Sequence, residues 1–291
     1  MSNLKIQDFF HKDTYTITYV VWDSASLDAM IVDPVMDYDH ASSTYFYDSV
    51  EIVYSFIQSN GLKVHNILET HAHADHLSGS QEFKRRFPGS KILIGKEISK
   101  VQATFKKIYN LHADFPTDGS QFDLLLNEGD EFALGSFTVK TIHTPGHTPA
   151  CYSYHVGDVV FTGDALFMPD FGVGRCDFPD GSAADLYQSV HEKLYALPDE
   201  TKTYTAHDYQ PGGREYRCQS TIGEQKKSNI HINAQTTKDG FVKFRTERDA
   251  TLSAPRLLLP SIEVNVDAGR FPPPENNGIS YLKIPLREKK K

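Results

Sequence analysis

The sequence predicts an α/β protein built as a four-layer αββα sandwich. The first half of the chain alternates strand-like and helix-like segments, and three strand-like segments follow one another closely between residues 137 and 161. Alternating segments indicate a sheet covered by helices, whereas closely spaced strands joined by turns indicate a second, largely antiparallel sheet. Two sheets with flanking helices stack as four layers.

The first sheet is expected from strands that alternate with helices of apolar 3.6-residue periodicity. In chain order these are strands at 15–21 and 29–32, a helix at 45–58, a strand at 64–70, a helix at 76–87, a strand at 91–94 and a helix at 98–109. The helix at 45–58 stops at Asn60-Gly61, a glycine C-cap. The strand at 64–70 leads into a histidine cluster, which we therefore expect at the carboxyl end of a strand, where α/β sheets place their sites.

The second half of the chain is expected to form the second sheet and its helices. Its predicted elements are strands at 137–142, 152–155 and 159–161, a helix at 183–197 and a strand at 201–205. We expect residues 1–222 to form the catalytic domain and residues 223–291 a C-terminal extension that packs on the core or on a partner subunit. The extension contains a predicted helix at 238–252 and a proline-rich stretch at 270–278.

Charge and composition exclude several classes of function. The formal net charge of -8 at pH 7, without a compensating basic patch, disfavours a nucleic-acid or membrane-surface role. We expect a soluble, cytoplasmic protein, because no signal-like N-terminus and no run of about eighteen apolar residues is present. The cysteines, Cys151, Cys176 and Cys218, are too few for a disulfide framework or a Cys-x-x-Cys metal site. The oligomeric state stays open, with a homodimer as one option.

Residues 71–76 read His-Ala-His-Ala-Asp-His. Three imidazoles and a carboxylate lie within six residues, and divalent metals such as zinc and iron take these nitrogen and oxygen ligands. A chain of this composition contains the pattern by chance only roughly two times in a thousand. The sequence therefore predicts a metal site.

Three further candidate ligands each follow a predicted strand. His147 lies in Thr-Pro-Gly-His-Thr-Pro, where the prolines and the glycine restrict the backbone around one imidazole. Asp164 follows an apolar strand beside a glycine that permits close approach, and His207 ends the last core strand. Their common position at strand ends predicts that they join the cluster of residues 71–76.

In this order the motifs resemble the metallo-β-lactamase superfamily, over about residues 15–210. For dinuclear members such as glyoxalase II, the resemblance implies two metals bridged by Asp164. It would place one metal on His71, His73 and His147 and the other on Asp75, His76 and His207.

A narrower resemblance comes from residues 174–178, Gly-Arg-Cys-Asp-Phe, together with residues 186–193 and 206–209. These resemble the persulfide dioxygenases of sulfide oxidation, and residues 168–172 and 254–260 resemble a bacterial β-lactamase-like hydrolase branch. The dioxygenase resemblance implies one Fe(II) held by His71, His147 and Asp164, a two-histidine, one-carboxylate set that suits O₂ chemistry. The groups that would then orient ligands and substrate are His73, Asp75, His76 and His207.

Three residues near these motifs are each open to two interpretations. Arg175, in a glycine-rich loop, clamps a carboxylate of a thiol carrier such as glutathione or forms a surface salt bridge. Cys176 replaces the threonine of the animal enzymes, and it is either a core residue or a thiol that exchanges with the persulfide. Tyr209 points its hydroxyl at the metal centre or packs beneath it.

The leading hypothesis is an enzyme that oxidises glutathione persulfide, or a similar small persulfide, with O₂ to sulfite and free thiol, using one Fe(II) per chain. The first alternative is a glyoxalase II-type thioester hydrolase that uses two Zn or two Fe ions. The second is a non-catalytic metal-binding module. The sequence does not decide between glutathione and coenzyme A as the carrier.

Overall fold

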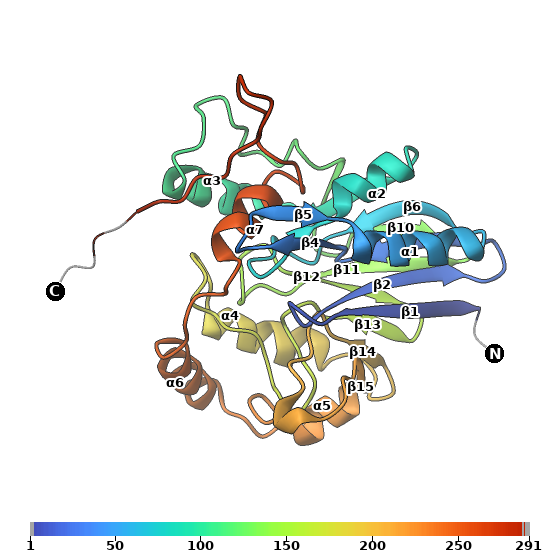
Figure 1. Ribbon diagram of the computed structural model, residues 1–291. Coiled ribbons are helices and arrows are strands. Elements are labelled where there is room, and N and C mark those ends of the chain that lie inside the picture. Colours follow the sequence, from blue (N-terminus) through green and yellow to red (C-terminus); the bar gives the residue numbers. More distant parts are fainter. Residues whose placement is uncertain (1–2, 287, 289–291) are drawn as a thin grey trace.

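The computed structural model describes residues 3–286 and residue 288 of the 291-residue chain. Two six-stranded sheets face each other, and helices lie outside each of them (Figure 1), so the predicted αββα sandwich is confirmed. The first sheet has the spatial order β1 (Leu4–His11), β2 (Thr16–Asp23), β3 (Asp28–Val32), β6 (Lys63–Leu68), β8 (Lys91–Gly95) and β9 (Leu124–Leu126). Pairing is antiparallel from β1 to β3 and parallel from β3 to β9.

The second sheet is antiparallel except for the parallel pair that β13 and β14 form. Its order is β10 (Glu131–Leu134), β11 (Phe137–His143), β12 (Tyr152–Val156), β13 (Val159–Phe161), β14 (Lys202–Tyr204) and β15 (Gln219–Thr221). A small third sheet has the order β5 (Thr44–Phe46), β4 (Val35–Asp39) and β7 (Leu77–Ser78).

The first sheet carries α1 (Asp48–Ser59), α2 (Ser80–Arg86) and α3 (Ile98–Ile108). The second carries α4 (Ala183–Gln188), continued by a π-helix (Ser189–Leu194), and then α5 (Ile222–Ser228) and α6 (Lys238–Asp249), with a 3₁₀ turn at Pro211–Gly213 between β14 and β15. Among the described residues, no helix is long and apolar enough to cross a membrane.

Strand β3 shows why its sequence is apolar without interruption. Ala29 and Ile31 pack against the outer helices, whereas Met30 and Val32 point between the two sheets. Alternate residues of a strand face opposite sides of the sheet, and both sides are covered here. The strand ends at Asp33, which is buried and has a positive φ of 49°.

The C-terminal extension contacts both helical layers. Ile232 and Phe241, which frame the start of α6, pack in the core cluster outside the second sheet. Residues 250–257 then cross to α7 (Leu258–Asn265), whose Ile262 joins the cluster outside the first sheet. Figure 1 shows this crossing, from the brown α6 to the orange-red α7. The predicted extension runs to residue 291, and residues 287 and 289–291 lie outside the described part.

Several predicted boundaries differ for physical reasons. The helix expected at 76–87 begins only at Ser80, because Leu77–Ser78 pair with β4. The helix expected at 183–197 changes to π-helical hydrogen bonding after Gln188 and ends at Leu194. Helix α7 was not predicted, since Pro260 interrupts a short apolar run that is too brief to display a period.

Candidate metal centre

The seven candidate ligands lie together where strands of both sheets end. Residues 71–76 follow β6, His147 follows β11, Asp164 follows β13 and His207 follows β14. All are buried except Asp75, whose side chain is 24% exposed. The prediction that strand ends bring these side chains together is therefore correct.

One group consists of His71, His147 and Asp164. Their potential ligand atoms all lie within 4.8 Å of one another. Nε2 of His147 is 3.5 Å from Oδ2 of Asp164, and the rings of His71 and His147 are 4.9 Å apart at their centroids. Two imidazoles and one carboxylate thus face a common point.

In both imidazoles of this group, a hydrogen bond made by Nδ1 fixes the orientation of the ring. Nδ1 of His147 donates to the carbonyl oxygen of Arg175 at 2.6 Å. The Thr70 hydroxyl donates to Asp33 at 2.9 Å, so its oxygen accepts a hydrogen bond from Nδ1 of His71 at 3.0 Å. In each ring Nε2 is left as the unprotonated nitrogen that a metal requires.

A second group consists of His73, Asp75 and His207, again with ligand atoms within 4.8 Å of one another. Nε2 of His207 lies 3.4 Å from Oδ2 of Asp75 and 3.5 Å from Oδ1 of Asp164. Asp164 therefore lies between the groups, with one oxygen toward His147 and the other toward His207. His76 lies beside the second group, with Nδ1 3.3 Å from the hydroxyl of Thr16.

The donor set fits a metal ion. Several of its buried atoms have no hydrogen-bond partner among the described residues: Nε2 of His71, Nδ1 of His73, Nε2 of His76, Oδ1 of Asp164 and both ring nitrogens of His207. Each such atom costs about 1–3 kcal/mol unless something satisfies it. Burial, reinforced by the neighbouring imidazoles, lowers the pKa of His71 and His73 well below the usual value, so both rings are neutral and able to bind metal.

Asp33 forms hydrogen bonds that hold residues 70–76, the loop that carries four of the candidate ligands and is called the ligand loop below. It accepts hydrogen bonds from the backbone N–H of Thr70 at 2.7 Å and from Nε2 of His73 at 3.0 Å, besides that of the Thr70 hydroxyl. Burial raises the pKa of Asp33 to about 6. Asp33 directly follows the strand expected at 29–32, as Asp164 follows its own apolar strand, so the sequence carries a local signal for it.

Asn265, at the end of α7, holds the same loop from the C-terminal extension. Its side-chain N–H groups donate to the carbonyl oxygens of His73 and His76, each at 2.8 Å, and its oxygen accepts from the N–H of Ser78 at 2.8 Å. No sequence motif pointed to this contact, which joins segments almost 190 residues apart.

Two glycines near the ligands are required for close packing. A Cβ on Gly146, which has a φ of +146°, would lie 2.3 Å from Cβ of Leu186. A Cβ on Gly174 would lie 2.5 Å from the carbonyl oxygen of Asp164. The glycine-rich loop thus lets the backbone approach the metal centre closely.

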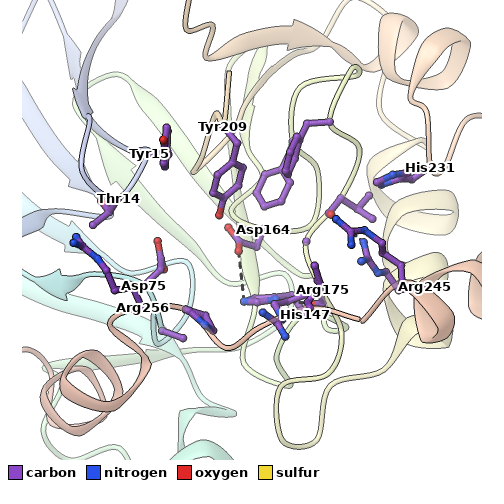
Figure 2. A pocket seen from close by; sticks show the side chains of 18 of the residues that line it. Thr14, Tyr15, Asp75, His147, Asp164, Arg175, Tyr209, His231, Arg245 and Arg256 are labelled. Atoms are coloured by element: carbon purple, nitrogen blue, oxygen red, sulfur yellow. Dashed lines mark hydrogen bonds and ion pairs between the residues drawn. The ribbon is translucent and has the colours of Figure 1, made fainter. Parts of the chain in front are cut away.

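A cavity of about 590 Å³ opens above the metal centre, lined by core residues and by the extension. Figure 2 shows Tyr209 directed toward Asp164 within it. The Tyr209 ring stacks on Phe171 with centroids 4.7 Å apart and remains 37% exposed. Of the two interpretations of Tyr209, the geometry favours a hydroxyl that faces the metal centre.

Arg175 and Cys176 are neighbours in the chain, but only Arg175 lines the cavity. Arg175 lines the cavity, but its guanidinium already donates twice to Asp177, at 2.5 and 2.6 Å, and once to the carbonyl oxygen of Ser253 at 2.7 Å. Cys176 is not among the residues that line the cavity; it packs in the core cluster outside the second sheet, and burial raises its pKa. Because Cys176 lies among the buried side chains outside the second sheet, the expected contact of Cys176 with substrate gives way to the core interpretation.

Buried imidazoles and carboxylates at the strand ends of an αββα sandwich define a metal-dependent enzyme. The family model described as "Metallo-beta-lactamase superfamily" matches residues 13–207, so the chain belongs to this superfamily.

Related proteins carry two kinds of name. "Glyoxylase B2" of Dictyostelium discoideum is 49% identical over 288 residues, which cover 98% of each chain. "Persulfide dioxygenase ETHE1, mitochondrial" of Mus musculus is 30% identical, over 92% of this chain and 90% of the relative. The crystal structure of ETHE1 from Myxococcus xanthus matches with a TM-score of 0.73 and 27% identity, covering 91% of this chain and all of the other. The resemblance found in the sequence is thus confirmed for the superfamily.

Proposed function

We propose that the protein is a mononuclear Fe(II) persulfide dioxygenase that acts on glutathione persulfide or a similar small persulfide. The overall reaction is GSSH + O₂ + H₂O → GSH + SO₃²⁻ + 2H⁺. As the S–S bond breaks, the outer sulfur loses five electrons and the carrier sulfur gains one, so that the persulfide loses four in all, and O₂ gains these four electrons. The carrier sulfur leaves as the free thiol.

The observation that carries the proposal is the separate group of His71, His147 and Asp164. A ferrous ion bound by two imidazoles and one carboxylate keeps open positions for O₂ and for a sulfur ligand. The hydrogen bonds to Thr70 and to the carbonyl of Arg175 preset both imidazoles for this task.

The remaining polar groups would orient the reactants and balance charge. Asp75 lines the cavity, with its Oδ2 3.4 Å from Nε2 of the buried His207, and Nε2 of His73 donates to Asp33. Tyr209 offers a hydroxyl for a hydrogen bond to substrate. A cavity of about 590 Å³ is of the size that holds a small organic ligand.

A dinuclear thioester hydrolase of the glyoxalase II type is the second candidate. It is favoured by Asp164, whose two oxygens face both groups, and by the second group of His73, Asp75 and His207, in which His73 stands in place of the His76 that the resemblance implies. The Dictyostelium relative's name agrees with this alternative. The persulfide dioxygenase relative and the Myxococcus structure support the first candidate.

The test combines metal content with two activities. We expect one iron per freshly purified chain, O₂ uptake with glutathione persulfide, and no hydrolysis of S-lactoylglutathione. A matched pair of variants, His71→Gln and His73→Gln, separates the candidates: the mononuclear site loses its iron only in the first. Two metals per chain, with loss of one in each variant and thioester cleavage, would instead establish the hydrolase. Metal binding without either activity would leave the non-catalytic module.

A further inference from the structure

The C-terminal extension contributes three arginines to the cavity wall, Arg245, Arg248 and Arg256. Figure 2 shows Arg256 on one side of the metal centre and Arg245 on the opposite side, beside Arg175 from the core. The chain as a whole is acidic, with a formal net charge of -8, so a cavity lined by four arginines stands out from the overall charge balance.

These arginines differ in how far they are neutralised. Arg175 is fully engaged by Asp177 and Ser253. Arg245 is only 3% exposed, pairs with Asp249 at 2.6 Å, and its Nε has no hydrogen-bond partner among the described residues.

Arg248, one turn further along α6, donates only to the hydroxyl of Thr251, at 3.2 Å. Within the described part of the chain no carboxylate lies at ion-pairing distance from it. The cavity carboxylates are Asp13, Asp75 and Asp164, of which the last two belong to the metal centre. The end of the cavity formed by α6 is therefore its most cationic part.

The surroundings of this end suit the rest of a small organic molecule. The His231 ring packs against Phe244 in a tilted arrangement with centroids 4.6 Å apart, and its buried Nδ1 lacks a partner among the described residues. Burial, together with the charge of Arg245, lowers the pKa of His231 to about 4, so the ring is a neutral hydrogen-bonding group. Ile230 and Leu252 add apolar surface beside it.

We propose that the α6 end of the cavity binds an anionic group of the thiol carrier, a carboxylate or a phosphate, and that Arg248 determines specificity for it. The inference rests on the proposed function only in that the substrate is a derivative of a small thiol, which holds for the dioxygenase and for the hydrolase. A guanidinium binds carboxylate and phosphate through paired N–H donors.

The test is calorimetric binding of S-methylglutathione, an unreactive probe, to the metal-loaded full chain. Charged hydrogen bonds of this kind correspond to about tenfold in affinity. We expect about tenfold weaker binding to Arg248→Gln, partial recovery in Arg248→Lys, and no change in the control Arg85→Gln, an exposed arginine of α2. The diethyl ester of the probe should bind the wild type weakly and be insensitive to Arg248→Gln.

Desulfo-coenzyme A serves as the phosphate probe and shows which anion the site prefers. Equal affinity of wild type and Arg248→Gln for both probes, or absence of binding to the wild type, overturns the inference. Because neither probe is oxidised or hydrolysed, binding that depends on Arg248 in a protein without O₂ uptake would sink the dioxygenase proposal and leave this inference standing.

Discussion

The metal centre, which forms the floor of the cavity, and the part of the cavity wall that the C-terminal extension contributes are built in different ways. The floor consists of short, buried imidazoles and carboxylates at strand ends, and each of His71, His73 and His147 has a second hydrogen-bond partner that fixes its ring. The part of the wall that the extension contributes consists of long side chains on α6 and on the crossing segment 250–257, and both Arg248 and Arg256 are exposed.

This difference separates two tasks. Rigid groups on a scaffold of strands hold a metal at defined distances, whereas adaptable cations on the rim select a substrate by charge. The two regions meet at Asn265, through which the extension also holds the backbone of the ligand loop. Variants in the floor should therefore abolish chemistry, and variants in the extension should weaken the protein more gently.

The largest effect is expected from removing a ligand of the floor. His147→Gln takes one imidazole from the group of His71, His147 and Asp164. Because supporting residues alone are worth about 10–100-fold in metal affinity, loss of a ligand should lower bound metal and activity by more than about 100-fold. Metal analysis and turnover measure this, and His65→Gln, an exposed histidine paired with Asp28, is the control. Retained metal would remove His147 from the site.

A smaller loss of metal affinity is expected from changing Asp33, which forms hydrogen bonds to Thr70 and His73. Asp33→Asn weakens the acceptor for His73 and Thr70 while keeping its size. Metal affinity should fall about 10–100-fold, as measured by competition with a chelator. Asp23→Asn alters an equally buried carboxylate, which serves the turn at Ser136, and should leave metal affinity unchanged. Equal effects of the two variants would show that Asp33 acts on stability alone.

A still smaller loss of metal affinity is expected from removing the hydrogen bonds that Asn265 of the extension forms with the ligand loop. Asn265→Ala leaves the carbonyl oxygens of His73 and His76 without their donor, at a cost of about 3 kcal/mol in the free energy of unfolding. We expect about tenfold lower metal affinity in addition, because the loop carries ligands. Asn229→Ala, a buried asparagine of the same extension that holds Gly172, should lose stability but keep metal affinity. Parallel losses in both variants would contradict the positioning role.

The difference between the metal centre and the extension also explains which residues of the site could be predicted from the sequence. Residues 71–76 were predicted from three histidines and an aspartate within six residues. His147, Asp164 and His207 were predicted because each follows a strand, and strand position is encoded locally by apolar runs. Asp33 carries the same local signal after β3 and could have been found. The helix that the chain forms after Pro255 could not, since a short apolar run interrupted by Pro260 has no period.

The three arginines that the extension contributes to the cavity, and Asn265, could not be predicted from the sequence for a different reason. Their roles depend on where residues 223–286 dock, and that docking is set by contacts such as Ile262 with the first helical layer and Phe241 with the second. Neighbouring residues in the chain do not encode such contacts. Cys176 shows the converse: a motif placed it near the site, but the direction of its side chain depends on local backbone geometry.

The smallest effect is expected at Glu263 on α7, which is 5% exposed and is not one of the candidate metal ligands. Burial raises its pKa from 4.5 to about 7, outweighing the backbone hydrogen bond from Lys283 at 2.8 Å and the positive charge of that residue, both of which lower the pKa. The folded state keeps a proton between pH 4.5 and 7 that the unfolded state releases, so the free energy of unfolding falls as pH rises through this window.

Glu263→Gln keeps a neutral side chain at every pH and should flatten this part of the pH dependence. Urea unfolding at pH 5 and pH 8 measures it, with Glu247→Gln on the exposed face of α6 as the control. Because Glu263 is neither a candidate ligand nor one of the residues that line the cavity, the pH profile of turnover should not change. If the free energy of unfolding had the same pH dependence in the wild type and in Glu263→Gln, α7 would loosen enough to hydrate this carboxylate. Helix α7 would then belong with the adaptable part of the extension and not with the rigid metal centre.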